Sequence, residues 1–548
     1  MLKQFQIIFL LGFLLFSNDL FSQSIDARSR NIEVLIGQSD RKGMFDGIHG
    51  VVGKVDDGFY VLRAQPKGTL GIGLSGGGPT TLFIDKYNND LKLKSSAEIE
   101  GIELTNGRLP RGSEYEFSMQ DADNNLYIYF SEFVKGINSL YRIKYNPSNK
   151  TFEEEVTIYR DKKANKKLDR RGSFSFVESE NRQRFAIYSF VNERNKRYTE
   201  VYVGVFERNL DKVWEMKENI DGYSRGGNVS LFSQTANKSF VGRNLSLSLS
   251  NSGVLNIMRR IYDDSLRGSL TGDYSHLIYS LSGSGDSVES RFFDFEDTFI
   301  LEAMIRHDQN NELSLVGYTG DQRNVIDGLV FINFDAKTLE TITERNMKLT
   351  DEQKKDFLVS ADADTRRKQR GDQRTERRID KGRNVRISAR NQLINVYVHK
   401  DNSTTVVSEY YDVDVNSYMD AAGMMQTTTT YIYGDLKYIN ISDEGDVRWV
   451  KNIHKEQRAS SPFTLSVSDL FLDDEIVYLY NDFEDYKLVM LTMDSEGNDL
   501  AFDIEDLGRR GELENHWFIP NSVKYLSEYE IVCFAMRALK TKLIKISL

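Results

Sequence analysis

The sequence predicts an all-β protein and, within that class, a closed β-propeller. The first observation is a hairpin pattern that recurs seven times, in which two strands of alternating apolar and polar residues flank a short turn rich in Asn, Asp, Gly or Ser. The second is a further strand before most of these hairpins. The third is a strand near the start of the chain that has no hairpin of its own. Hairpins repeated along a chain indicate a ring of antiparallel sheets.

The seven hairpins define the repeating unit. Most successive turns lie roughly 50 to 75 residues apart, which suits one four-stranded sheet per repeat. The turns centre on Asn89, Pro147, Leu210, Ser284, Ala336, Glu444 and Ser495. The hairpins span residues 82–99, 140–158, 201–220, 277–295, 329–347, 436–453 and 488–504. A further strand precedes six of them, at residues 58–64, 125–132, 184–190, 254–262, 312–318 and 475–482.

The two ends of the chain predict how the ring closes. Residues 31–37, NIEVLIG, have the pattern of a strand without a local partner, and residues 530–538 and 542–548 supply two more strands. We expect the N-terminal strand to pair with the C-terminal strands and complete an eighth sheet, because a closed ring removes the exposed edges that promote aggregation. Eight blades is therefore the predicted number, and seven is the alternative.

Composition agrees with one large β-structure behind a targeting segment. Hydrophobic residues make up 40% of the 548, which is enough for an extensive core. The apolar run at residues 7–16 follows Lys3 and is shorter than the roughly 20 residues of a membrane-spanning helix. We expect residues 1–22 to be a signal peptide and residues 23–548 to form the propeller, exported to the periplasm or associated with the outer membrane.

A basic segment lies in the longest interval between hairpins. Residues 361–390 contain 11 Lys or Arg against 5 Asp or Glu, whereas the whole chain has a net charge of −11. The overall charge argues against a general nucleic-acid-binding protein. Thr350 and Gln353 have the spacing of a capping box. We expect a charged helical insertion over residues 351–386, broken near Gly371.

The arginines of this insertion are the candidate partner-binding residues. A charge run commonly means only a solvated surface. The functional alternative is a docking arm for an acidic partner or for lipid headgroups. The candidates are Arg366, Arg367, Arg370, Arg374, Arg377 and Arg378.

Motifs that resemble catalytic or metal sites lie in unsuitable contexts. The glycine-rich residues 68–79 match a dinucleotide fingerprint and a nucleophile elbow, but both need a following helix, and Pro79 leads into a strand. Residues 121–132 have calcium-loop spacing, but Leu126 occupies the position that requires glycine. The six histidines show no metal-binding spacing. The sequence therefore names no catalytic residue, no metal ligand and no cofactor.

One stretch carries a resemblance to a known family. SEYYDVDV at residues 408–415, the hairpin and following segment at 433–457, and YND at 480–482 resemble a family of uncharacterised secreted Bacteroidetes propeller-like proteins. The resemblance covers residues 349–482 and implies a propeller and export, without an enzymatic activity. We expect Trp449 of this stretch to pack between blades, and the polar side chains of Lys451, Lys455 and Gln457 to be solvated.

Two classes of function fit these observations. The first is a non-catalytic interaction or scaffold protein of the bacterial cell envelope, a subunit of an outer-membrane-associated export (type 9 secretion) or uptake complex. Its partner would be a protein such as an outer-membrane β-barrel, with membrane association only through partners and no nucleic acid. The alternative is a secreted carbohydrate-active or peptide-handling enzyme that uses carboxylates at the central channel of the propeller.

Overall fold

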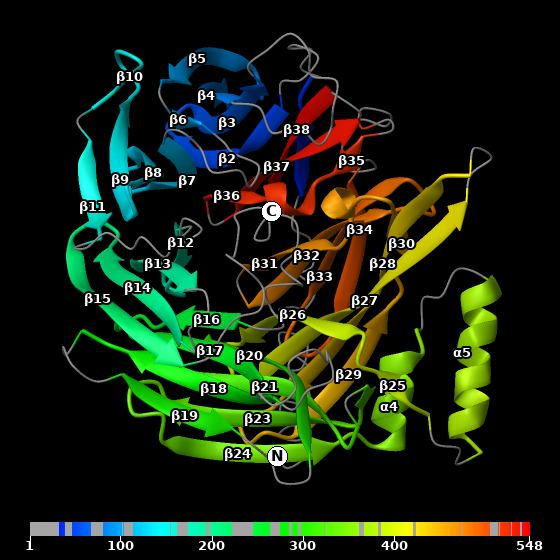
Figure 1. The fold of residues 1–548 in the computed structure, drawn as a ribbon. Coiled ribbons are helices and arrows are strands. Elements are labelled where there is room, and N and C mark those ends of the chain that lie inside the picture. The colour runs from blue at the N-terminus through cyan, green and yellow to red at the C-terminus, as the bar shows by residue number, and fades with distance from the viewer. Residues whose placement is uncertain are drawn as a thin grey trace, which may run out of the picture.

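The chain folds into a β-propeller-like, all-β structure. The structure is a computed structural model, and it describes residues 32–38, 47–66, 80–100, 102–103, 113–153, 155–161, 174–192, 198–221, 245–262, 274–283, 288–293, 298–308, 310–322, 324–360, 366–381, 385–419, 423–472, 474–504, 513, 516–527, 529–537 and 540–548. In these residues, eight largely antiparallel sheets of four to six strands follow one another along the chain (Figure 1). No helix among them is long and apolar enough to cross a membrane.

The first four sheets occupy the N-terminal half. The first contains β2 (Gly47–Val55), β3 (Gly58–Pro66), β4 (Thr80–Asn88) and β5 (Leu93–Ile99). The second contains β6 (Ile102–Glu103), β7 (Ser113–Gln120), β8 (Leu126–Val134), β9 (Ile137–Asn146), β10 (Thr151–Phe152) and β11 (Val156–Arg160). The third contains β12 (Phe174–Glu178), β13 (Arg184–Asn192), β14 (Tyr198–Glu207) and β15 (Lys212–Asp221), and the fourth contains β16 (Leu245–Leu249), β17 (Leu255–Tyr262), β18 (Tyr274–Leu281) and β19 (Glu289–Phe293).

The other four sheets follow in the same manner. The fifth contains β20 (Phe299–His307), β21 (Glu312–Gly320), β23 (Gly328–Asp335) and β24 (Thr341–Lys348). The sixth contains β26 (Asn391–Val398), β27 (Thr404–Met419), β28 (Met425–Ile441), β29 (Val447–Ile453) and β30 (Gln457–Ala459). The seventh contains β31 (Val467–Leu472), β32 (Glu475–Asp482), β33 (Lys487–Met493) and β34 (Asp499–Asp503), and the eighth contains β1 (Glu33–Ile36), β35 (Trp517–Phe518), β36 (Lys524–Ser527), β37 (Glu530–Arg537) and β38 (Lys540–Ser547).

All seven predicted hairpins are present as antiparallel strand pairs. They are β4–β5, β9 with β10 and β11, β14–β15, β18–β19, β23–β24, β28–β29 and β33–β34. Their turns use the residue types that the sequence showed. In the β33–β34 turn, Gly497 has a φ of 84°, and the Asp494 carboxylate accepts backbone hydrogen bonds from Glu496 and Asn498 at 3.0 and 2.8 Å.

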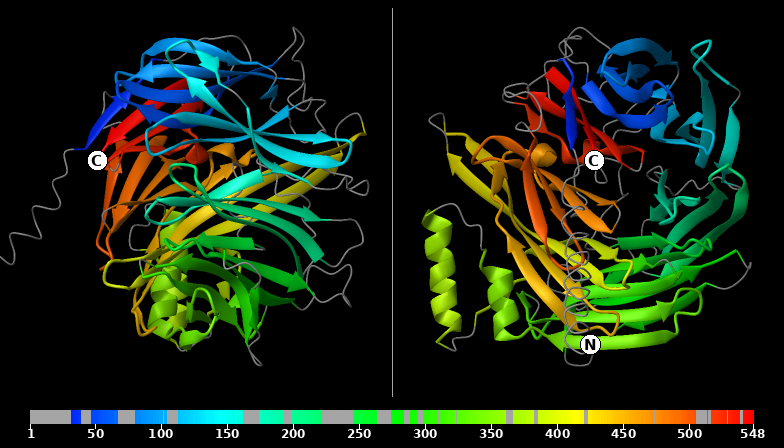
Figure 2. Two further views of the ribbon diagram at one scale, coloured as in Figure 1. Left: turned by 90° about the vertical axis from the view of Figure 1, so that its left-hand side faces the viewer. Right: turned by 180° about the vertical axis from the view of Figure 1, so that it is seen from behind.

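The sheets are arranged around a common centre. Figure 1 shows the early strands of the sheets, such as β12, β16, β20 and β26, facing the middle, with the later strands outside. Contacts between β2 and β7, β7 and β12, β12 and β16, β16 and β20, and β20 and β26 link neighbouring sheets at the inside. The views in Figure 2 show the same sequence of sheets from the side and from behind.

Eight apolar cores lie between neighbouring sheets. Each joins two sheets that are consecutive along the chain, except for one, which joins the eighth sheet to the first. In this last core, Phe59 and Val61 of β3 share one cluster with Val532 and Phe534 of β37. Each sheet therefore buries apolar residues against both of its neighbours.

The first and last strands of the described chain pair with each other. β1 runs antiparallel to β38, with Val34 opposite Ile546 and Ile36 opposite Ile544. This is the pairing that the sequence predicted. Val34 and Ile36 also pack against the core between the seventh and eighth sheets, so β1 contributes both backbone and side-chain contacts.

The charged insertion contains two helices that leave the fifth sheet. They are α4 (Asp351–Leu358) and α5 (Arg366–Ile379), and the two-stranded sheet of β22 (Val325–Ile326) and β25 (Ile387–Ser388) attaches the C-terminal end of the insertion to the segment that precedes β23. The capping box is confirmed, since Gln353 N donates to Thr350 Oγ1 at 3.2 Å and Thr350 N donates to Gln353 Oε1 at 2.9 Å.

The expected break at Gly371 is wrong. Helix α4 already ends at Leu358, because Val359 has an extended backbone with φ −104° and ψ 129°. Gly371 lies inside α5, and a Cβ atom added at this position would have no other atom within 4 Å. Glycine in a helix costs only about 1 kcal/mol relative to alanine, which the rest of a 14-residue helix can offset.

Deleting residues 32–37 tests the role of β1 in closure. The deletion removes four paired positions of β1 and leaves the edge of β38 unpaired. We expect aggregation during purification and a thermal unfolding midpoint lower by more than about 5 °C, measured by calorimetry. The matched control is Leu35→Ala, which shortens an exposed side chain of β1 and keeps the backbone pairing. Equal midpoints for wild type and deletion would show that the ring does not depend on β1.

Candidate functional site

The predicted arginines lie on α5, the outermost element of the structure. Figures 1 and 2 show α4 between α5 and the sheets. All six candidates fall within α5, and the four whose side chains are described, Arg370, Arg374, Arg377 and Arg378, are exposed. Their spacing of three or four residues places them on one side of the helix.

The opposite side of α5 is fixed to α4. Lys355 Nζ of α4 is 3.4 Å from Glu376 Oε1, and Ser360 N lies 3.5 Å from a carboxylate oxygen of the buried Asp372. Helix α4 is itself anchored by Phe357, which is fully buried and packs edge-on against Tyr318 at a ring-centroid distance of 6.1 Å. The acidic and apolar side of the insertion thus faces the protein, and the basic side faces solvent.

A long hairpin also projects from the sixth sheet. Strands β27 and β28 remain paired from Thr404↔Ile441 to Met419↔Met425, and Figure 1 shows their ends reaching beyond the neighbouring strands. The hairpin tip exposes five apolar side chains, with Met419 and Met425 69% and 70% exposed. The five are Val415, Tyr418, Met419, Met424 and Met425. The sequence showed this segment only as Thr-rich, and the exposed methionines were missed.

A pocket of about 470 Å³ opens where five sheets meet. Its wall is formed by the ends of β2, β7, β12, β31 and β36 and by the turns that follow β7, β12 and β14. Six charged side chains line it: Lys54, Glu178, Glu180, Arg182, Arg208 and Lys524. This set could not be recognised from the sequence, because its members come from segments far apart in the chain.

The two glutamates of this pocket differ in their surroundings. Glu178 Oε1 accepts a hydrogen bond from Arg208 Nη1 at 2.5 Å. Glu180 Oε2 is buried and has no hydrogen-bond partner among the described residues. Burial raises the pKa of Glu180, as does Asp308, while Arg306 opposes the shift. One carboxylate is therefore held as an ion pair, and the other is favoured in its protonated form relative to an ordinary glutamate.

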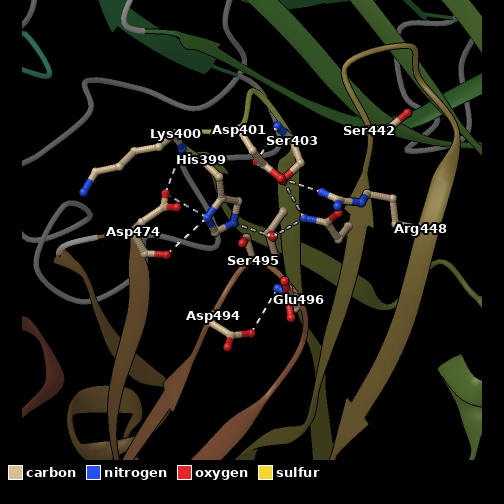
Figure 3. A network of polar contacts seen from close by, with 12 residues as sticks. His399, Lys400, Asp401, Ser403, Ser442, Arg448, Asp474, Asp494, Ser495 and Glu496 are labelled. Carbon is tan, nitrogen blue, oxygen red and sulfur yellow. Dashed lines mark hydrogen bonds and ion pairs between the residues drawn. The ribbon is translucent and has the colours of Figure 1, made fainter. Parts of the chain in front are cut away.

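A hydroxyl–imidazole–carboxylate series lies between the sixth and seventh sheets (Figure 3). His399 Nε2 is 2.8 Å from Thr405 Oγ1, and His399 Nδ1 is 3.1 Å from Asp474 Oδ1. The order of groups matches a nucleophilic triad. However, Thr405 is fully buried and His399 is 2% exposed, so no substrate can reach the hydroxyl. The series instead joins two sheets, since Asp474 also accepts a hydrogen bond from the Lys400 backbone at 2.9 Å.

The residues that carry the family resemblance meet in a second buried network. Glu409 and Lys455 form a buried ion pair, and Lys455 Nζ donates to Gln457 Oε1 at 2.9 Å. Gln457 Nε2 donates to the carbonyl of Asn481 at 2.7 Å. The expectation that Lys455 and Gln457 are solvated is wrong, because the segment after β29 turns inward to link the sixth and seventh sheets. Trp449 does pack between these sheets, as predicted.

The calcium-like segment is a capped turn. Asp121 Oδ1 accepts backbone hydrogen bonds from Asp123 and Asn125 at 3.0 and 2.9 Å, and Asp121 Oδ2 accepts one from the Asn125 side chain at 2.8 Å. Glu132 is engaged elsewhere, by Ser113 Oγ at 2.6 Å. Within the described ranges, no group of three or more His, Cys, Asp or Glu is arranged to hold a metal ion. The glycine-rich stretch 68–79 and the expected signal peptide lie outside the described residues.

The comparisons with known proteins identify no family. No family model matches the chain, and no curated protein matches it. Among solved structures, it is similar to the WD40 domain of SCAP from fission yeast, with 10% identity and a TM-score of 0.36 over 94% of this chain and 98% of that one. It is also similar to an apocarotenoid oxygenase from Synechocystis, with 10% identity and a TM-score of 0.33 over 85% and 93% of the two chains. Likenesses this low carry no conclusion about fold or function.

A buried histidine between the fourth and fifth sheets makes stability depend on pH. His307 is 2% exposed, and its Nδ1 is 2.8 Å from Ser248 Oγ. Burial, together with the neighbouring Arg306, lowers the pKa of His307 to about 3. The unfolded chain binds a proton near pH 6.5 whereas the folded protein stays neutral, so this contribution is complete above pH 6.5 and is lost as the pH falls toward 3.

His307→Gln should reduce this acid sensitivity. Between pH 7 and pH 5 the wild type should lose about 2 kcal/mol of unfolding free energy that the variant keeps, because glutamine does not titrate. Urea denaturation at both pH values measures the difference between the two proteins. Parallel losses in wild type and variant would show that His307 takes up its proton in the folded state as well.

Proposed function

We propose that this protein is a non-catalytic interaction protein of the bacterial cell envelope, built as a closed eight-bladed β-propeller. The closed ring is supported by the cycle of eight cores and by the pairing of β1 with β38. Eight sheets of at least four strands favour eight blades over seven. A closed propeller holds its loops and insertions rigidly, and these supply the usual binding surfaces of such folds.

The observation that carries the interaction function is the exposed arginine side of α5. Its described arginines face away from α4, while Glu376 and Asp372 hold the helix in place. A helix whose acidic residues are used for attachment presents a cationic surface that an acidic protein surface can match. The partner-binding residues of this proposal are Arg366, Arg367, Arg370, Arg374, Arg377 and Arg378.

The β27–β28 tip supplies an apolar contact that complements this arm. Charged surfaces steer the association of a partner, whereas apolar side chains contribute most of the binding energy of a stable interface. Methionine is suited to the second role because its flexible side chain adapts to different surfaces. The tip and α5 both lie between β24 and β29 in the chain.

The place of this function follows from the signal-peptide pattern at residues 1–22 and from the family resemblance. Both favour export to the periplasm or the outer membrane. The partner in this proposal is a protein of an outer-membrane-associated export assembly, such as the type 9 secretion apparatus, or of an uptake complex. An outer-membrane β-barrel or its accessory subunit would bring the protein to the membrane.

The enzymatic alternative depends on Glu178 and Glu180 in the pocket of about 470 Å³ described above, which we call the central pocket. A glycosidase needs one carboxylic acid and one free carboxylate on either side of the bond to be cleaved. Glu180 suits the acid, but Glu178 is paired with Arg208, which weakens its action as a base or nucleophile. The interaction function does not require a free carboxylate in the pocket and is therefore preferred.

Replacing Arg370, Arg374, Arg377 and Arg378 by Ser tests the arm. We expect at least about tenfold weaker retention of the native partner at low salt, with a smaller effect at high salt, because screening already weakens charge attraction there. The matched control replaces four exposed lysines elsewhere, Lys92, Lys150, Lys337 and Lys540, by Ser. Equal loss in both variants would point to net charge alone, and no loss in either would remove the arm from the proposal.

Affinity purification from native membranes tests the proposal as a whole. Reproducible recovery of an outer-membrane β-barrel protein with the tagged chain would support it and identify the complex. Recovery of the chain alone, together with glycan or peptide turnover that Glu180→Gln abolishes, would establish the enzyme instead.

A further inference from the structure

The central pocket has the size and the polar groups of a small-ligand site. Its volume of about 470 Å³ falls within the range of ordinary ligand pockets. Its walls come from the first, second, third, seventh and eighth sheets, so the closed ring fixes their relative positions. Apolar and aromatic side chains, including Phe176, Phe471 and Leu526, alternate with the charged ones.

Several polar groups of the wall are already engaged in holding the sheets together. Gln120 joins β7 to β2, because its Oε1 accepts a hydrogen bond from Lys54 N at 2.6 Å and its Nε2 donates to the Lys54 carbonyl. Tyr525 OH accepts a hydrogen bond from Phe471 N at 3.1 Å. Lys54 Nζ pairs with Glu530 Oε2 at 3.2 Å. These groups shape the pocket but are not free to bind a ligand.

Two cations of the wall remain without a carboxylate partner in the part of the chain that the structure describes. Arg182 lies over the Tyr525 ring, with its guanidinium carbon 4.2 Å from the ring centroid. The Lys524 ammonium is attracted by Glu178, without a direct ion pair or hydrogen bond among the described residues. The nearby carboxylate of Glu178 is taken by Arg208 at 2.5 Å. The pocket thus holds more positive than negative charge.

The surroundings of Lys524 are unfavourable for an ammonium in the unliganded protein. Burial lowers the pKa of Lys524, Glu178 raises it, and Arg208 and Arg182 lower it further. A half-buried cation next to two like charges is stabilised when an anion enters and forms charge-assisted hydrogen bonds with it.

We propose that the central pocket binds a ligand through a single carboxylate, held by Lys524 and Arg182. The guanidinium of Arg182 is fixed against Tyr525 and offers its remaining N–H groups, and the Lys524 ammonium supplies the second cationic donor. Two sources of such a carboxylate fit the pocket: an acidic peptide side chain and a uronic acid.

Isothermal titration with matched acidic and neutral probes tests this site. The acidic probes are triglutamate and trigalacturonate, and their neutral counterparts are triglutamine and trigalactose. We expect one acidic probe to bind at least about tenfold more tightly than its counterpart, because only the acidic form pairs with the two cations. Triglutamate binding would identify the peptide source, and trigalacturonate binding would identify the uronic acid.

The variants Lys524→Met and Arg182→Met should each weaken that binding by about tenfold or more. Lys524→Met should also raise the unfolding midpoint, by about 2 °C or more, because it removes a poorly solvated cation and keeps most of the length of the side chain. A lysine needed for structure would instead lower the midpoint. The control is Lys540→Met, which changes an exposed lysine of β38 and should leave both measurements unchanged.

The proposal is overturned if neither acidic probe binds the wild type at about 1 mM, or if both methionine variants bind as tightly as the wild type. If one variant fails to fold, the other still decides, since the two cations come from different sheets.

Discussion

The arrangement of this protein depends on a cyclic constraint, in which every sheet must bury apolar residues against two neighbours. Eight cores satisfy that constraint, and the last of them can form only if the eighth sheet meets the first. The pairing of β1 with β38 places both ends of the described chain in that same eighth sheet. Stability is therefore shared around the ring, and a fault at the junction of the ends exposes two apolar faces at once.

The polar networks between sheets serve the same constraint. The Thr405–His399–Asp474 series bridges the sixth and seventh sheets, and the Glu409–Lys455 pair of the sixth sheet reaches the seventh through Gln457, which donates to the Asn481 carbonyl. A buried charge pair contributes little net stability, but breaking it by removing one partner is costly. Such groups therefore favour one relative position of two sheets over sliding alternatives. Geometry that resembles a catalytic triad is in this case a means of alignment.

The sequence predicted the outer parts of the sheets better than the inner strands. Hairpins such as β33–β34 follow from alternating residues and an Asp–Gly turn, and the end-to-end pairing follows from two unpartnered strands. Strand β7 was missed although its apolar residues alternate with polar ones, because the groups that bury those polar residues come from other parts of the chain. Its Glu116 is 1% exposed and accepts a hydrogen bond from Phe174 N of the next sheet. The pocket could not be predicted for a similar reason, because Lys524 and Arg182 line it together although they lie far apart in the chain.

The packing of each sheet against its neighbours also limits where binding functions can be added. The side-chain packing between sheets leaves little freedom within the ring, so variable elements must lie at its edges or at its centre. The α4–α5 insertion and the β27–β28 hairpin occupy the outside, and the carboxylate-binding pocket that we propose occupies the inside. The arm draws on the chain between the fifth and sixth sheets, whereas the pocket draws on the first three and the last two. The two surfaces share no residues, and so a partner on the arm and a small ligand in the pocket can be bound and tested independently.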